Sequence, residues 1–150
     1  LFGFNKYFNI FKDLYNNSLF PNKILISGIS GLGKATFAYH FINFALSINE
    51  EKNYNFSNFE IDNLNRSFNL IKKNSHPNFF LIDLIDDQQT IDINQIRNMI
   101  NYSTKTTFNQ NKKRNDYSML VNVKLKGRGL CTSSVTLIGS QPRIMLQLIT

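Results

Sequence analysis

The chain has almost no cysteine, with one residue, Cys131, among 150. A single thiol excludes a disulfide framework and any zinc site built from two or four cysteines. Long hydrophobic runs are also missing, and none approaches the ~20 apolar residues that a membrane-spanning helix requires. The first residues show no basic stretch followed by an apolar one. We therefore expect no secretory signal, no membrane contact and a cytoplasmic location.

Acidic residues are missing after Asp116, and this absence gives the end of the chain its charge. Over the whole chain 17 lysines and arginines face 10 acidic residues, for a formal net charge of +7. Lys124, Lys126, Arg128 and Arg143 supply +4 of it. A basic segment favours polyanionic partners, so one interpretation is a nucleic-acid binder that uses this tail.

Asparagine and phenylalanine become scarce near the same position. Of 22 asparagines, 21 lie at or before Asn115, and all 14 phenylalanines lie at or before Phe108. The apolar share of 42% is sufficient for a folded protein. We interpret residues 1–114 as one region and residues 115–150 as a compositionally distinct tail. That tail is either a second structural unit or a stretch that does not belong to the original reading frame.

The spacing of apolar residues predicts alternating helices and strands. Four stretches have the spacing of a helix: residues 5–19, 33–47, 64–73 and 93–103. Short apolar runs predict strands over residues 23–27 and 79–85, with weaker strand predictions at 118–125 and 134–138. The polar residues 49–63 are typical of a loop or frayed linker. This order of elements predicts an α/β fold with parallel strands and helical crossovers.

One stretch carries a chemical motif. Residues 28–36 read Gly-Ile-Ser-Gly-Leu-Gly-Lys-Ala-Thr and fit the G-x-x-x-x-G-K pattern of a phosphate-binding loop. Glycines allow positive φ and bring backbone N–H groups close to phosphate oxygens, while Lys34 would reach the β- and γ-phosphates. ATP is therefore the candidate nucleotide. The candidate phosphate-binding residues are Gly28, Ser30, Gly31, Leu32, Gly33, Lys34, Ala35 and Thr36.

The residue after Lys34 argues against hydrolysis. Loops of this kind place a Ser or Thr there, whose hydroxyl binds Mg²⁺. Ala35 has no hydroxyl, and Thr36 points about 100° away around the helix. Asp83 is a weak candidate metal ligand. We prefer to interpret it as the residue that ends a buried strand, because Leu84 follows it where such sites usually have a Glu as general base. Mg²⁺ is thus a weak candidate cofactor, and no catalytic residue is assigned.

The remaining chemistry-bearing residues form no pattern. His40 and His76 are interpreted as surface or packing residues. Cys131 is a weak nucleophile candidate on a poorly defined segment. The basic run at residues 112–114 is typical of a solvated loop.

Several segments together carry a family resemblance. They are residues 19–26 (LFPNKILI), 28–39 (GISGLGKATFAY), 75–78 (SHPN) and 91–97 (IDINQIR). Through them residues 1–48, and less closely 76–114, resemble the delta-prime family of bacterial DNA polymerase III clamp-loader subunits, which are AAA+ proteins. The resemblance implies a P-loop NTPase fold of the AAA+ type, an α/β parallel sheet with flanking helices. The fold would be incomplete, because the sensor and arginine-finger segments expected after about Arg114 are missing, and we expect an N-terminal fragment.

The resemblance also implies a function. The chain would be a non-catalytic or weakly nucleotide-binding subunit that supports loading of the sliding clamp in DNA replication. Its partners would be the gamma/tau and delta subunits and, through the complex, the sliding clamp and primed DNA. The zinc cysteines of some family members are absent, so no zinc is expected. Two alternatives stay open: an active P-loop ATPase or kinase of another family, with Asp83 completing its metal site, and the nucleic-acid binder.

Overall fold

The computed structural model describes the chain in seven stretches: residues 3–21, 23–29, 31–83, 92–104, 118–123, 132–140 and 143–149. The chain divides into two compact units, which are described separately. The first consists of Leu1–Pro21 and Ala35–His76, and the second of Asn22–Lys34 and Pro77–Thr150. These units do not follow the compositional boundary near residue 115, and the division into 1–114 and 115–150 stays a prediction.

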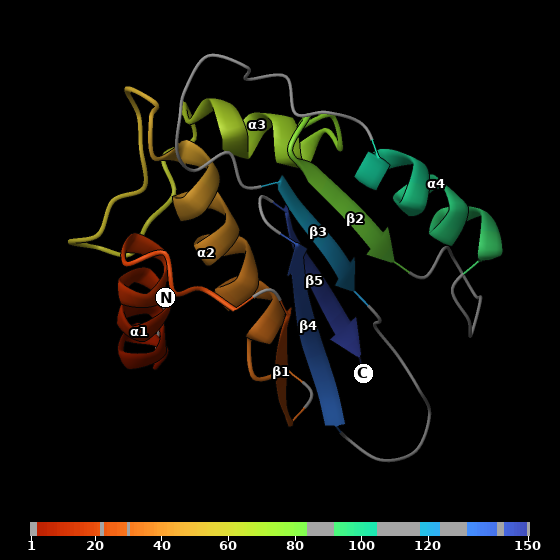
Figure 1. Ribbon diagram of the computed structural model, residues 1–150. Coiled ribbons are helices and arrows are strands. Elements are labelled where there is room, and N and C mark those ends of the chain that lie inside the picture. Colours follow the sequence, from red (N-terminus) through yellow and green to blue (C-terminus); the bar gives the residue numbers. More distant parts are fainter. Residues whose placement is uncertain are drawn as a thin grey trace. The chain divides into compact units, whose positions relative to one another are not determined.

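The first unit is built from three helices (Figure 1). They are α1 (Asn5–Asn16), α2 (Lys34–Ser47), of which all but Lys34 belongs to this unit, and α3 (Arg66–Lys72). All three were predicted from apolar spacing. Helix α1 ends earlier than predicted because Ser18 adopts a positive φ of 57°, a conformation that cannot continue a right-handed helix.

Aromatic rings form the core of the first unit. Phe8 on α1 is completely buried, at 0% exposure. Six rings lie within 6.4 Å of its centroid: those of Phe37, Phe41, Phe44, Tyr54, Phe56 and Phe59. Most of these pairs are tilted or edge-to-face, the arrangement that the ring quadrupoles favour. The predicted apolar face of α2 is therefore confirmed.

The segment between α2 and α3 is a loop, as predicted, but it is not frayed. Tyr54 is 2% exposed and stacks on Phe8 with a centroid distance of 5.1 Å. Asn55 and Glu60 form an isolated antiparallel bridge that closes the loop. Of the two alternatives for this segment, the loop is confirmed and the frayed linker is not, because three of its aromatic residues pack on Phe8 of α1.

The second unit contains a five-stranded sheet and helix α4 (Ile93–Thr104). The strands are β1 (Lys23–Ile29), β2 (Phe79–Asp83), β3 (Ser118–Val123), β4 (Thr132–Ser140) and β5 (Arg143–Ile149). Their order in the sheet is β1-β4-β5-β3-β2. Helix α4 packs beside β2 (Figure 1), where the rings of Phe80 and Tyr102 lie 5.1 Å apart.

The sheet is mixed, which corrects the prediction of a parallel sheet. Strand β2 pairs with β3 in parallel, in register Leu81↔Val121, but β4 runs antiparallel to β1, in register Leu25↔Thr136. Strand β4 is also antiparallel to β5, and only two residues separate them. So short a connection cannot hold the crossover that parallel strands need. Strand β5 was not predicted, and the protein is a mixed α/β protein.

None of the helices in the described part of the chain is long and apolar enough to span a bilayer.

Candidate functional site

The predicted phosphate-binding residues run from the last two residues of β1 to the first turn of α2. The strand ends at Ile29, and α2 begins at Lys34. Gly31 and Gly33 both adopt positive φ, at 79° and 87°. Residues with a Cβ are disfavoured in this region, so the two glycines allow the turn from strand to helix. The positive φ expected from the sequence is confirmed at these two positions.

The lysine of the motif is held inside its own loop. The Lys34 Nζ donates hydrogen bonds to the backbone oxygens of Gly28, at 2.7 Å, and Ile29, at 2.6 Å. The side chain is only 5% exposed, and burial lowers the pKa of its ammonium group. Hydrogen bonds from a charged donor are stronger than those between neutral groups. The loop therefore holds the ammonium group of Lys34 against the carbonyl groups at the end of β1.

Space alone does not require glycine at position 28, because a Cβ there would make only ordinary van der Waals contacts. A Cβ there would lie 3.4 Å from Leu32 Cδ2 and 3.7 Å from Lys34 Cδ. Leu32 itself is 55% exposed, so it is not a core residue of the loop. Ser30, also predicted as a phosphate-binding residue, lies outside the described residues.

The last two predicted site residues lie in the first turn of α2. Ala35 is half-buried and Thr36 is exposed. Both belong to the first unit, whereas Gly28 to Lys34 belong to the second. The helix thus begins without a hydroxyl at the position directly after Lys34.

The weak metal candidate Asp83 is the last residue of β2, where its backbone pairs with Val123. Its side chain lies outside the described part of the structure. Strands β1 and β2 occupy opposite edges of the sheet, so the sheet does not place Asp83 beside Lys34. In the described ranges no group of three or more His, Cys, Asp or Glu residues could hold a metal ion. Cys131 and residues 112–114 also lie outside these ranges.

A buried polar network in the first unit was not predicted. Asn65, 0% exposed, caps α3 by accepting a hydrogen bond from the Phe68 backbone N–H at 2.6 Å. Its carboxamide oxygen also accepts from Asn43 Nδ2 at 2.9 Å. The carboxylate of Glu50 accepts from the Ser67 backbone N–H at 3.1 Å and from its hydroxyl at 2.6 Å. Together these acceptors satisfy the N-terminal donors of a short helix.

His76 completes this network. It is 9% exposed, and its Nε2 lies 3.1 Å from Ser67 Oγ. Because Ser67 Oγ donates its proton to Glu50, His76 Nε2 carries the hydrogen and donates to that oxygen. Burial lowers the pKa of His76 to about 4, although the nearby Glu50 acts in the opposite direction. Sequence spacing alone offered no sign of this contact.

The fold and the site together define a class of protein: a mixed α/β protein with a glycine-lysine loop after its first strand. The family model described as "DNA polymerase III, delta subunit" matches residues 3–115. No curated protein and no solved structure matches the chain. The chain belongs to the DNA polymerase III delta-subunit family, which makes it a clamp-loader-type subunit of DNA replication that associates with other subunits of that complex. The resemblance found in the sequence is confirmed at this level.

Proposed function

We propose that the chain is a delta-prime-type subunit that supports clamp loading without hydrolysing ATP itself. The observation that carries the proposal is Ala35, which stands directly after Lys34 at the start of α2. Phosphoryl transfer in phosphate-loop proteins depends on a Mg²⁺ ion held by a hydroxyl at this position. Without that hydroxyl the loop retains its phosphate-binding groups but loses a ligand for the metal.

The geometry of the loop supports weak nucleotide binding. The backbone turn at Gly31 and Gly33 and the cation of Lys34 are present before any phosphate arrives. Two of the three N–H donors of Lys34 already bond to carbonyl oxygens, at 2.6 and 2.7 Å, so an ATP phosphate would compete with these carbonyls for all but one donor. This competition lowers the expected affinity, because each lost charge-assisted hydrogen bond has to be replaced.

The proposal extends to fold, location and partners. Residues 1–114 would correspond to the N-terminal part of an AAA+ P-loop domain, and the protein would act in the cytoplasm. Its partners would be the gamma/tau and delta subunits, and it would reach the sliding clamp and primed DNA only through the assembled complex. No zinc would be required, and Mg²⁺ would bind with ATP only weakly.

Nucleotide titration with and without Mg²⁺ tests the loop. The unaltered chain is expected to bind ATP weakly, with little Mg²⁺ dependence and no turnover above background. Ala35→Ser restores the hydroxyl and should increase the Mg²⁺ dependence of binding, whereas Lys34→Ala should abolish binding. Strong Mg²⁺-dependent turnover by the unaltered chain would contradict the proposal and favour an active ATPase or kinase.

Reconstitution of the clamp loader tests the subunit role. Complexes assembled with the chain should load the clamp onto primed DNA, and complexes that lack it should not. The Lys34→Ala variant is expected to load as well as the unaltered chain, because the proposed role lies in assembly rather than in hydrolysis. Loss of loading by this variant in an intact complex would show that the loop works as a nucleotide switch.

A further inference from the structure

The loop of residues 49–63, which follows α2 in the first unit, is joined to that helix by a side-chain hydrogen bond. The hydroxyl oxygen of Tyr54 in the loop lies 2.8 Å from Nδ1 of His40 on α2. Tyr54 is 2% exposed, and its ring stacks on Phe8 with a centroid distance of 5.1 Å. His40 is half-buried, so solvent has access to part of its ring. A buried hydroxyl thus meets a titratable group that protons can reach.

The tyrosine hydroxyl is the donor of this bond. Among the described residues it has no other hydrogen-bond partner. A buried phenol proton needs an acceptor, and the lone pair on Nδ1 of a neutral imidazole supplies one. The hydrogen of the neutral ring is therefore assigned to Nε2. Once the ring gains a second proton, Nδ1 becomes a donor and the phenol proton loses its acceptor.

The charges around His40 also favour its neutral form. Burial lowers the pKa of the imidazole, and the positive charge of the amino group at the start of the chain acts in the same direction. In the described ranges, none of the acidic side chains of the first unit forms an ion pair with His40. These side chains are Asp13, Glu50, Glu51, Glu60 and Asp62. The ring is therefore held in the form that accepts from Tyr54.

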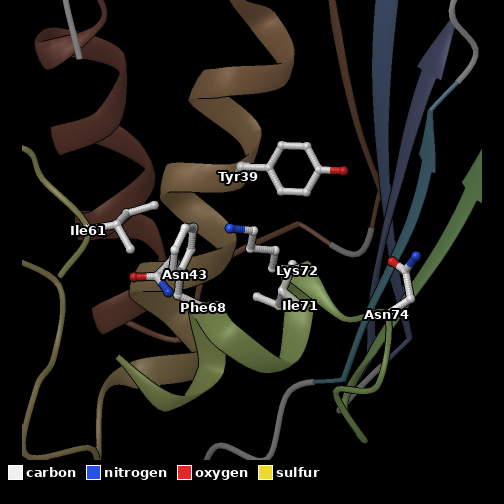
Figure 2. Close-up of a pocket in the computed structure, with 7 residues that line it drawn as sticks. All are labelled: Tyr39, Asn43, Ile61, Phe68, Ile71, Lys72 and Asn74. Carbon is white, nitrogen blue, oxygen red and sulfur yellow. The ribbon is translucent and has the colours of Figure 1, made fainter. Parts of the chain in front are cut away.

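The loop also borders a cavity and a surface hollow. Ile61 of the loop lines a cavity of about 250 Å³ together with residues of α2 and α3 (Figure 2). A hollow of about 550 Å³ is lined by residues 51–57 and 60–62 of the loop. Groups that line such spaces lack van der Waals contacts on one side. Segments with few buried contacts open more easily than the fold as a whole, so the Tyr54 anchor carries much of the attachment of this loop.

We propose that His40 and Tyr54 form a proton-sensitive latch, in which protonation of His40 releases the loop from α2 while the helices stay folded. The Tyr54 hydroxyl would turn toward water, and its ring would leave the stack on Phe8. The antiparallel bridge between Asn55 and Glu60, which closes the loop, would open with it. The latch is closed when the ring is neutral, at pH 7, and opens as the medium becomes acidic. It does not depend on the phosphate-binding loop or on nucleotide.

Amide hydrogen exchange of the full chain tests the latch, with His40→Asn as the reference. Asn offers an acceptor near the place of Nδ1 but does not titrate. For Asn55 and Glu60, the exchange rate divided by that of the reference at the same pH should be near one at pH 7 and roughly tenfold higher at pH 5. The same ratio for Ile42, in the middle of α2, should stay near one. A ratio near one for Asn55 and Glu60 at pH 5, or an equal rise at Ile42, would overturn the proposal.

Tyr54→Phe separates the hydrogen bond from the burial of the histidine ring. Phe keeps the stack on Phe8, so the variant is expected to fold, but it donates no proton to Nδ1. The neutral ring of His40 loses a stabilising bond, so His40 should bind a proton about fivefold more tightly, as measured by NMR titration of its ring signals. His76, followed in the same spectra, is the internal control and should titrate unchanged. Equal midpoints for His40 in the two proteins would overturn the latch.

Discussion

The phosphate-binding loop and the aromatic core of the first unit are held in place by interactions of very different range. Lys34 bonds to carbonyl groups that lie five and six residues earlier in the chain. Phe8 instead packs on rings of α2 and of the loop that follows it, far away in sequence. The loop therefore depends on its own residue types, whereas the core depends on the path of the whole unit. Substitutions in the core should be much more costly than substitutions in the loop.

Phe8→Ala is expected to have the largest effect on stability. The ring is fully buried at 0% exposure, and its removal leaves a cavity among the surrounding aromatic rings. Truncation of a buried Phe lowers the free energy of unfolding by about 3–5 kcal/mol. Chemical denaturation of the full chain measures the change. Tyr7→Ala, at 57% exposure on the same helix, is the matched control and should cost only ~0.5 kcal/mol. Equal losses would contradict the assignment of the buried face of α1.

Asn65→Ala should have the next largest effect. The change removes the cap of α3 and leaves the Asn43 Nδ2 without its acceptor inside the unit. We expect a loss of about 2–3 kcal/mol, from one lost cap and one unpaired buried donor. Denaturation of Asn63→Ala, an exposed neighbour, provides the control and should show almost no change. A loss below ~0.5 kcal/mol for Asn65→Ala would mean that water replaces the network.

His76 should make the stability of the chain depend on pH. Its pKa is about 4 in the folded protein against 6.5 as the ordinary value, with burial as the main cause. Between these values the unfolded chain binds a proton that the folded chain does not bind. The free energy of unfolding should therefore fall as the pH is lowered from 6.5 to 4, by on the order of 2 kcal/mol.

Denaturation at a series of pH values, compared with His76→Gln, isolates this contribution. Gln keeps a donor for Ser67 Oγ but does not titrate, so the variant should lose less stability than the unaltered chain as the pH falls. A constant difference between the two proteins from pH 7 to 4.5 would show that His76 titrates normally.

Gly31→Ala should have the smallest effect, because it tests backbone conformation alone. The residue has φ of 79°, and an added Cβ would have no heavy atom within 4 Å. The expected loss of about 1 kcal/mol is therefore the cost of a Cβ in the left-handed region. Gly31→Asn should cost less, since Asn tolerates this region better. A loss for Gly31→Ala as large as that for Phe8→Ala would remove the distinction between the loop and the core.

Much of the local structure could be predicted from the sequence. The helical spacing of Phe37, Phe41 and Phe44 predicted α2, and these residues are buried as expected. The apolar run before Gly28 predicted β1, which extends to Ile29. Strand β5 was missed, and the direction of β4 was wrong, because strand pairing depends on segments that are distant in sequence. The contact of His76 with Ser67 was missed because it depends on how the end of α3 folds back, which the spacing of residue types does not reveal.

By itself, the sequence determined the helices of the first unit, the glycine-lysine loop and the replacement of a metal-binding hydroxyl by Ala35, because residue type and spacing act within a few residues. It also carried enough of the family pattern for the chain to be placed among DNA polymerase III clamp-loader subunits. Only the tertiary structure decided that the sheet is mixed and that Asn43 keeps a buried oxygen without a hydrogen-bond partner. These features depend on contacts between groups that are distant in sequence. Burial makes such contacts specific, because a polar group without a hydrogen-bond partner away from water is costly.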